Sequence, residues 1–232
     1  MTNNFPKLFA KIGIVVDDEN LISNVFVHRS YLNENKTFDL PSNEKLEFLG
    51  DSVLSLISSI YLYKNYPNLD EGDYTDIKAS IVRMESLSEV GSAIGLGEHL
   101  LLSKGEESNS GRTNTNILAD CFEALIAAIF LNKGFDTAYD FVTKFLFSDK
   151  LDKIIQNKLY LSPKSHLQEL SQDKFKILPI YTITQESGPE HSKSFTVTVS
   201  IAEKEYATAE GKSKKQAEEN AARLALEKLL KE

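Results

Sequence analysis

The chain has 232 residues, of which 41% are hydrophobic and 26% are charged, and its formal net charge at pH 7 is −8. This length and composition exclude disorder as the main state and predict one large or two modest domains. The longest apolar stretches, such as Ile117–Phe130, are interrupted by acids and are shorter than the roughly 20 residues of a membrane helix, so no membrane span is expected. The N-terminus lacks the pattern of a signal peptide and Cys121 is the single cysteine, so a cytoplasmic protein without disulfides is expected.

Residues 43–146 follow a helical pattern. Apolar residues recur at spacings of three and four in segments that begin at Leu46, Ile77 and Ile117. Polar stretches that contain glycine, at 66–72 and 103–116, separate these segments and predict loops. The second stretch is long, which is typical of a mobile or functional loop. A helical bundle is therefore expected here.

The pattern changes towards the C-terminus. Apolar periodicity fades after residue 149, and a new pattern begins at Ser162-Pro163. We expect a helix, three strands and a second helix, at 163–172, 180–185, 195–201, 205–209 and 213–230. In the middle strand, apolar and polar residues alternate, which predicts one buried face. The predicted fold is a mainly α N-terminal domain, residues 1–158, followed by a small α+β (α-β-β-β-α) domain, residues 161–232.

The negative charge is concentrated in the first part of the chain, because residues 161–232 contain equal numbers of basic and acidic side chains. Neither part is basic overall, so the net charge does not by itself indicate a nucleic-acid-binding protein. Such a function would have to depend on local clusters of basic residues.

Two of the most apolar predicted helices carry acidic residues on one face. Glu44, Glu47 and Asp51 are spaced at i, i+3 and i+7, which places them within an arc of about 60°. Asp120 and Glu123 share a face of the second helix. A solvated surface is the ordinary explanation, but carboxylates set in apolar helices repel one another unless a cation neutralises them. Carboxylate ligands favour Mg²⁺ or Mn²⁺, and such a site suits phosphodiester hydrolysis.

The last predicted helix begins with a cluster of lysines. Ser213 and Gln216 have the spacing of a capping box, which places Lys214 and Lys215 in the first turn. Lysines at this position oppose the positive end of the helix dipole, and a bound anion would compensate for them. Together with Lys212 they predict a phosphate-binding helix terminus. A solvated charge cluster is the alternative.

Two sets of motifs follow one another along the chain. The first consists of NEKLEFLGDSVL, DEGDYTDIKASIVR, LSKGEE and ILADCFEALIAAIFL. The second consists of PKSHLQEL, the turn at 187–191 and GKSKKQAEENAA. In this order the motifs resemble bacterial ribonuclease III, an endonuclease domain followed by a double-stranded RNA-binding domain, and the resemblance extends from about His28 onward.

The resemblance implies a homodimer with one acidic, Mg²⁺-dependent site in each subunit, in which Mn²⁺ can substitute and no organic cofactor takes part. It implies that Glu47, Asp51, Asp120 and Glu123 form the metal-centred site, that Asp51 and Glu123 are catalytic, and that Glu44 is an auxiliary acidic residue. The implied RNA-binding residues are Ser165, Gln168, Gln172, Pro189, His191, Lys212, Lys214 and Lys215.

Two positions depart from the family pattern. Ser165 stands where threonine is common, which keeps the hydroxyl group but removes a methyl group. The family usually has paired glycines before an arginine in the long polar loop, whereas this chain has Ser110-Gly111-Arg112. The carboxylates of the implied site are all present.

The expected function is Mg²⁺-dependent endonucleolytic cleavage of double-stranded RNA to 5′-phosphate and 3′-hydroxyl products with short 3′ overhangs, with ribosomal RNA precursors as the substrates that the family implies. The alternative is a non-cleaving scaffold protein that binds duplex RNA. A small-molecule phosphohydrolase would explain the acids but not the second domain.

Overall fold

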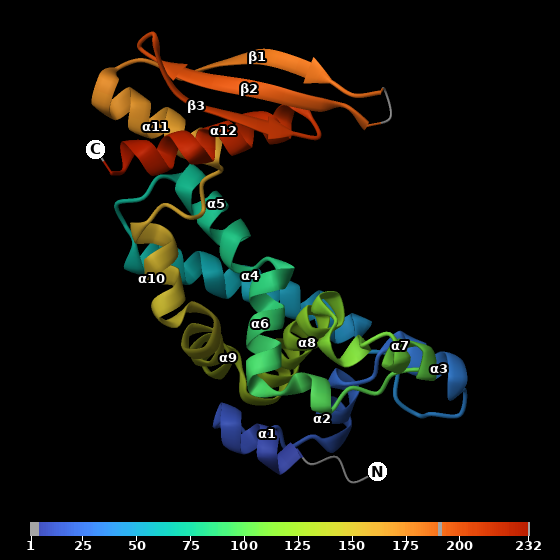
Figure 1. Ribbon diagram of the computed structural model, residues 1–232. Helices are drawn as coiled ribbons and strands as arrows, with labels where there is room; N and C mark the ends of the chain where they lie inside the picture. The colour runs from blue at the N-terminus through green and yellow to red at the C-terminus, as the bar shows by residue number, and fades with distance from the viewer. Residues whose placement is uncertain (1–4, 190–191, 232) are drawn as a thin grey trace. The chain divides into compact units, whose positions relative to one another are not determined.

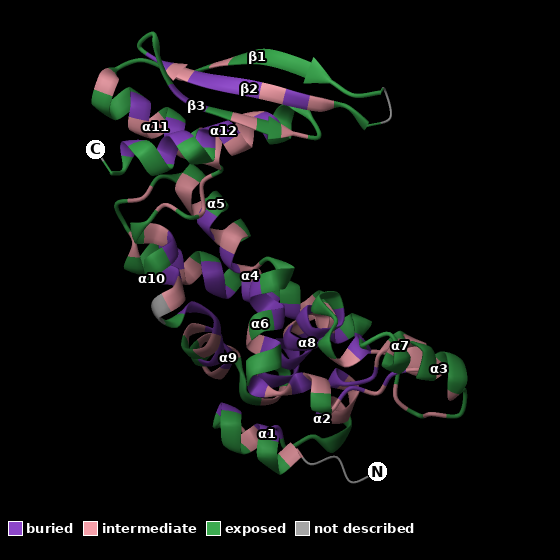
Figure 2. Ribbon diagram, viewed as in Figure 1, coloured by how far each residue is buried: buried purple, intermediate pink, exposed green. Residues whose placement is uncertain are grey.

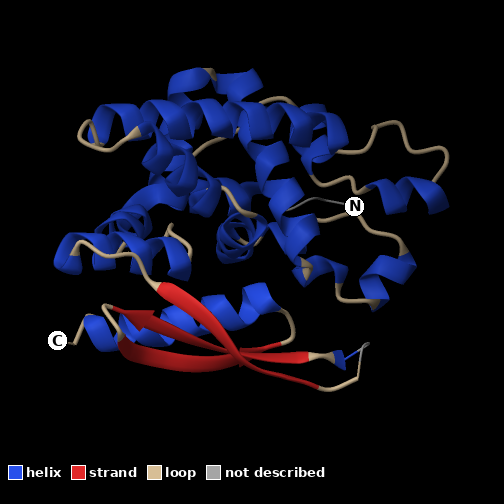
Figure 3. Ribbon diagram, turned by 90° about the horizontal axis from the view of Figure 1, so that it is seen from above, coloured by secondary structure: helices blue, strands red, loops and turns tan. Residues whose placement is uncertain are grey.

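The computed structural model of the protein describes residues 5–189 and 192–231. The chain forms two compact units, Met1–Ile155 and Gln156–Glu232. Figure 3 shows that the larger unit is built of helices and loops, and that the strands belong to the smaller one. The predicted fold class, a helical domain followed by a small α+β domain, is confirmed.

The first unit contains two long helices, α4 (Glu44–Asn65) and α8 (Thr115–Lys133). Two of its short segments, η1 and η2, are 3₁₀ turns, and η3 is a π-helical turn. The bounds of the shorter segments are α1 (Phe5–Ile12), α2 (Glu19–Val25), α3 (Arg29–Glu34), α5 (Glu71–Ile81), α6 (Met84–Ile94), η1 (Leu96–Glu98), α7 (Lys104–Ser108), η2 (Gly111–Thr113), α9 (Phe135–Val142), η3 (Thr143–Phe147) and α10 (Ser148–Gln156).

Helix α8 is the core helix of this unit. Most of its residues are buried, and it packs against α4, α6 and α9 (Figure 2). In length and hydropathy both α4 and α8 reach the range of membrane-spanning helices, so the expectation that no segment is long and apolar enough is wrong. A helix surrounded by protein is apolar on all sides for the same reason as one surrounded by lipid, and α8 is of the first kind.

The contact between α4 and α8 depends on Gly50. A Cβ atom at this position would lie 1.9 Å from the backbone oxygen of Glu123, far inside van der Waals contact. The missing side chain therefore allows the two helix backbones to touch. Gly91 of α6 has a similar role in the contact with α8, where a Cβ atom would lie 3.1 Å from the backbone oxygen of Leu118.

The second unit is a three-stranded antiparallel sheet with the strand order β1-β2-β3. Its two helices lie together on one face of the sheet (Figure 1). All the expected elements are present, although their ends differ from the predicted ones by a few residues. Their bounds are α11 (Pro163–Phe175), β1 (Ile180–Ser187), β2 (Ser194–Ile201), β3 (Lys204–Gly211) and α12 (Lys214–Leu229).

The central strand β2 buries one face, as the alternation of its residues predicts, with one exception. Thr198 belongs to the polar set but is only 5% exposed. It lies between Thr182 on β1 and Thr208 on β3, which cover it from both sides, and its hydroxyl is 2.8 Å from that of Thr208. The buried face packs against the alanine-rich side of α12, and its residues are Phe195, Val197, Val199 and Ile201.

Candidate active site and RNA-binding surface

The N-terminal half of α4 carries the first row of predicted acids. Glu44 and Asp51 are exposed and Glu47 is half-buried. Glu47 precedes Gly50 by three residues and Asp51 follows it directly, so the backbone contact at Gly50 brings both acids to the edge of α8. The same contact therefore builds the core and positions these carboxylates.

The start of α4 is fixed by Asn43. This residue is 3% exposed, its side-chain amide donates to the carbonyl of Val25 at 3.1 Å, and its backbone N–H donates to the carbonyl of Val27 at 2.9 Å. Glu44 and Glu47 then occupy the first turn, where the helix dipole favours negative charge.

Helix α8 supplies the second pair of acids. Asn114 caps the helix and accepts hydrogen bonds from the backbone N–H groups of Asn116 at 2.9 Å and Ile117 at 3.2 Å. Asp120 and Glu123 follow on the same side and are half-buried, whereas Cys121 between them is fully buried. The two carboxylates thus leave the core on the side of α8 that faces α4.

The acids of the two helices form one electrostatically coupled cluster. Burial, together with the carboxylates of Asp51, Glu47 and Asp120, raises the pKa of Glu123 to about 8. Burial and the nearby Asp120 and Glu44 also raise the pKa of Glu47, and burial raises that of Asp120. The structure therefore brings together all five acids that the sequence singles out: each of them influences at least one of the others.

A pocket of about 470 Å³ opens beside this cluster. Several of its residues were not predicted, because they lie outside the periodic helices and have no recognisable spacing to the acids. They come from the start of α3, from α7 and from the start of α8. The lining residues are His28, Arg29, Asn43, Glu44, Glu47, Glu106, Asn114, Asn116, Ile117 and Asp120.

The cluster is not a preformed metal cage. Within residues 5–189 and 192–231, no three Asp, Glu, His or Cys side chains converge closely enough to hold a metal ion. The donors that α4 and α8 bring together are nevertheless all carboxylate oxygens, which are ligands for hard divalent cations.

The loop before α8 is held by Arg112. Its guanidinium group binds both carboxylate oxygens of Glu107, at 2.6 and 2.9 Å, and donates to the carbonyls of Gly97 at 2.8 Å and Leu100 at 3.1 Å. Ser110, where the family usually has glycine, has a φ of 62° and so adopts the left-handed conformation that glycine adopts more easily. The loop closes onto Arg112 with serine at this position.

In the second unit, the three predicted residues of α11 form an exposed row. Ser165, Gln168 and Gln172 are spaced at i, i+3 and i+7 and all three are exposed. Ser162 caps the helix, accepting a hydrogen bond from the backbone N–H of Ser165 at 3.1 Å. Pro189, in the turn after β1, is also exposed, and His191 lies outside the described residues.

The start of α12 is capped in the way the sequence predicts. The hydroxyl oxygen of Ser213 accepts a hydrogen bond from the backbone N–H of Gln216 at 3.2 Å. The side chain of Gln216 reaches back to the backbone N–H of Lys212 at 2.9 Å, one residue earlier than in the usual capping box. Lys212, Lys214 and Lys215 are all exposed beside this terminus.

Comparison with known proteins gives the same two-part organisation. Residues 18–150 match the family model for ribonuclease-III-like domains, and residues 163–229 match the model for the double-stranded RNA-binding motif. The chain is 42% identical to Ribonuclease 3 of Clostridium acetobutylicum over 96% of both chains. It is 43% identical to Ribonuclease 3 of Geobacillus sp. over 97% of this chain and 91% of the relative.

A solved structure agrees with these matches. The nuclease domain of ribonuclease III from Campylobacter jejuni superimposes with a TM-score of 0.58 at 33% identity, covering 63% of this chain and 99% of that domain. The coupled acids, the exposed polar row and the lysine cluster all lie within the matched parts of the sequence. The chain therefore belongs to the ribonuclease III family of endoribonucleases and carries a double-stranded RNA-binding motif.

Proposed function

We propose that this protein is a Mg²⁺-dependent endoribonuclease that cuts both strands of duplex RNA and leaves 5′-phosphates, 3′-hydroxyls and short 3′ overhangs. The observation that carries the proposal is the coupled carboxylate cluster of α4 and α8, in a chain that also contains a double-stranded RNA-binding motif. Ribosomal RNA precursors are the expected substrates, and the cytoplasm is the expected compartment.

The chemistry of the cluster fits Mg²⁺. Its donors are carboxylate oxygens, which bind Mg²⁺ or Mn²⁺ in preference to softer metals. Burial and the neighbouring carboxylates raise the pKa of Glu123, so that without a cation the cluster retains a proton that a divalent ion would displace. Because the described side chains do not already converge, ion binding would require the carboxylate groups to move closer together.

Each acid would then have a distinct role. Glu47, Asp120 and Glu123 would hold the ion, while the exposed Asp51 would orient the attacking water towards phosphorus. Bound Mg²⁺ lowers the pKa of water and stabilises negative charge on the leaving oxygen. As the water oxygen bonds to phosphorus and gives up a proton, the bond from phosphorus to the 3′-oxygen would break and the 3′-oxygen would take up a proton. This leaves a 3′-hydroxyl and places the phosphate on the 5′ end of the next nucleotide. Glu44 remains auxiliary.

The second unit selects the substrate by shape. The major groove of A-form RNA is too narrow for side chains to read, so recognition depends on 2′-hydroxyls and phosphates. The row Ser165, Gln168 and Gln172 is suited to the minor groove, with Pro189 and His191 at a second minor groove. Lys212, Lys214 and Lys215 are suited to the phosphates between them, where the capped terminus of α12 adds backbone N–H groups.

We further propose that the first unit forms a homodimer through α4. Phe48, Leu56 and Tyr63 lie along one side of this helix and are 77%, 53% and 74% exposed. An exposed apolar strip of this kind marks a protein interface, and a two-fold axis would pair the strip with its own copy. The Campylobacter jejuni relative is described as having a region involved in dimer formation of its nuclease domain.

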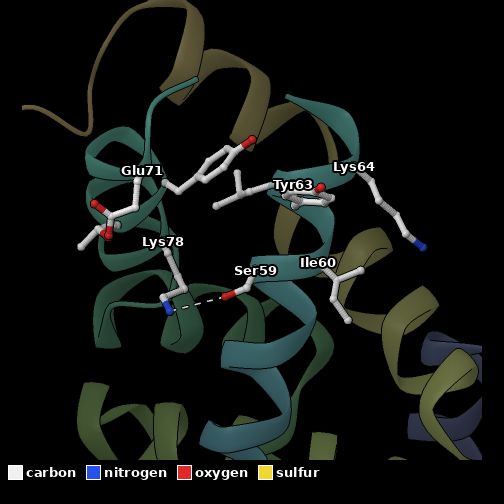
Figure 4. Close-up of a pocket in the computed structure, with 9 residues that line it drawn as sticks. Ser59, Ile60, Tyr63, Lys64, Glu71 and Lys78 are labelled. Atoms are coloured by element: carbon white, nitrogen blue, oxygen red, sulfur yellow. Dashed lines mark hydrogen bonds between the residues drawn. The ribbon is translucent and has the colours of Figure 1, made fainter. Parts of the chain in front are cut away.

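A second pocket continues the strip. It lies between α4 and α5, has a volume of about 650 Å³, and is lined by Tyr63, Tyr74 and Lys78 among others (Figure 4). The ammonium group of Lys78 donates hydrogen bonds to the hydroxyls of Ser55 and Ser59, at 3.4 and 3.5 Å. Because the pocket is open and largely apolar, we include it in the proposed interface.

Replacing Glu123 with glutamine should abolish cleavage. The amide keeps the shape of the side chain but cannot bind a cation as a carboxylate does, so cleavage of long duplex RNA should fall more than about 100-fold. Denaturing gels with and without Mg²⁺ measure this loss. The exposed Glu227 of α12 provides the control, because Glu227→Gln should cleave like the wild type. Intact RNA in every lane, with a shifted band on a native gel, would mean that the protein only binds duplex RNA.

The same variant has a second readout, in stability. An acid whose pKa is raised by folding keeps its proton longer in the folded state, so the free energy of unfolding falls as pH rises from about 4.5 to about 8. In the absence of metal, the free energy of unfolding of Glu123→Gln should not show the part of this fall that Glu123 causes. Because Glu123 is partly exposed, we expect that part to be about 1 kcal/mol. Mg²⁺ should raise the melting temperature of the wild type at pH 8 more than that of the variant. Parallel pH profiles would contradict the coupled cluster.

Removing the two lysines of the first turn of α12 should weaken the binding of duplex RNA and make the affinity less dependent on salt concentration. Each lost phosphate contact should lower the slope of log K against log salt by about 1, so Lys214→Ala with Lys215→Ala should lower it by about 2. Binding is measured by fluorescence anisotropy without Mg²⁺, so that the RNA stays intact. Lys231→Ala, in the same unit, is the matched control. An unchanged slope would show that the cluster is a solvated surface.

Placing a charge on the apolar strip should dissociate the dimer. In a two-fold interface, Leu56→Asp introduces two like charges close together, which should shift the protein from dimer to monomer at micromolar concentration. Sedimentation velocity measures the change. Val15→Asp, at an apolar residue that is 54% exposed outside the strip, should leave the dimer intact. The proposed interface is wrong if Leu56→Asp remains a dimer.

A further inference from the structure

We propose that Arg29 contacts a phosphate of the RNA backbone and positions it in the carboxylate pocket for cleavage. This inference rests on the proposed function, because Arg29 lines the same pocket as Glu47 and Asp120. It adds to the acidic site a residue whose charge is opposite to that of the acids.

The pocket presents a problem of charge for an RNA substrate. Its lining includes the carboxylates of Glu44, Glu47, Glu106 and Asp120, and a phosphodiester is itself an anion. Among the lining residues, Arg29 is the sole lysine or arginine. A planar guanidinium group presents paired N–H donors that match two phosphate oxygens, so Arg29 is the side chain of this pocket best suited to hold the backbone.

The arginine side chain is available for such a contact. It is 74% exposed, and its ion pair with Glu44 spans 3.7 Å through a single nitrogen. Ion pairs this long and this exposed are weak, so an approaching phosphate can replace Glu44 as the partner of Arg29. Glu44 then acts as a resting partner, which gives this auxiliary acid a defined task.

The backbone around Arg29 is anchored to the site from two sides. Val27 forms a parallel bridge with Leu101, and the backbone N–H of His28 donates to the carbonyl of Leu101 at 3.2 Å. The carbonyl of Val27 in turn accepts the backbone N–H of Asn43 at 2.9 Å, at the start of α4. Arg29 is therefore held at a fixed place relative to the acids of α4, as a positioning residue requires.

A competing explanation is that Arg29 only neutralises the acids when no metal is bound. The two explanations predict opposite effects on the metal. The positive charge of Arg29 opposes that of Mg²⁺, so a substrate-contacting arginine can be removed without loss of metal binding, and the affinity should stay the same or rise. If Arg29 instead holds the acids together, its removal should weaken metal binding and stability as well.

The test measures cleavage and metal binding separately for Arg29→Ala and Arg29→Lys. With enzyme in excess over a defined RNA duplex at saturating Mg²⁺, Arg29→Ala should cleave about 10- to 100-fold more slowly than the wild type. Arg29→Lys should recover part of the rate, because lysine keeps the charge but not the paired donors. The Mg²⁺ concentration that gives half of the rise in melting temperature should be unchanged or lower in both variants.

Arg83 provides the matched control. Its side chain is 60% exposed and pairs with Glu85 at 3.9 Å, but it does not line the pocket. Arg83→Ala should behave like the wild type in both assays. If the wild type cleaves and Arg29→Ala cleaves at the full rate, this inference is wrong but the proposed function stands. The same conclusion follows if Arg29→Ala loses both cleavage rate and Mg²⁺ binding. Absence of cleavage by the wild type would overturn the proposed function, and this inference with it.

Discussion

The contact between Gly50 of α4 and the backbone of Glu123 on α8 is the constraint on which the active site depends. Because a Cβ atom at Gly50 would lie 1.9 Å from the backbone oxygen of Glu123, the two helices can pack in this way only without a side chain there. The contact brings Glu47 and Asp51 close enough for their charges to act on Glu123, and burial with this repulsion raises the pKa of Glu123. The apolar core around α8 holds these acids together despite their repulsion.

The sequence predicts those features of the site that depend on helical phase. Glu47 and Asp51 share a face because their spacing is close to a full number of turns, and Asp120 and Glu123 do so for the same reason. The cap at Ser213 was predictable because it is local, formed by residues three apart. Features that depend on a few neighbouring residues can therefore be derived from the chain alone.

Other features of the structure depend on contacts between segments that are distant in the sequence, and the apolar periodicity of the sequence does not predict such contacts. Gly50 has the sequence context of an ordinary helical residue, and its role becomes visible only when α8 is placed beside it. Arg29 belongs to a six-residue helix and reaches the acids because Val27 bridges Leu101 and binds Asn43. Thr198 belongs to the polar set of β2, and the alternation along this strand does not reveal how closely its neighbours on β1 and β3 cover it.

The most direct test of the central claim compares Gly50→Ala with Gly72→Ala. The added methyl group at Gly50 must push α4 from α8, which should cost about 1–3 kcal/mol or more in urea unfolding and reduce the stabilisation by Mg²⁺. Gly72, in α5, has nothing within 4 Å of an added Cβ atom, so its replacement should be neutral or slightly stabilising. Wild-type stability and an unchanged response to Mg²⁺ in Gly50→Ala would contradict the claim that this contact assembles the site.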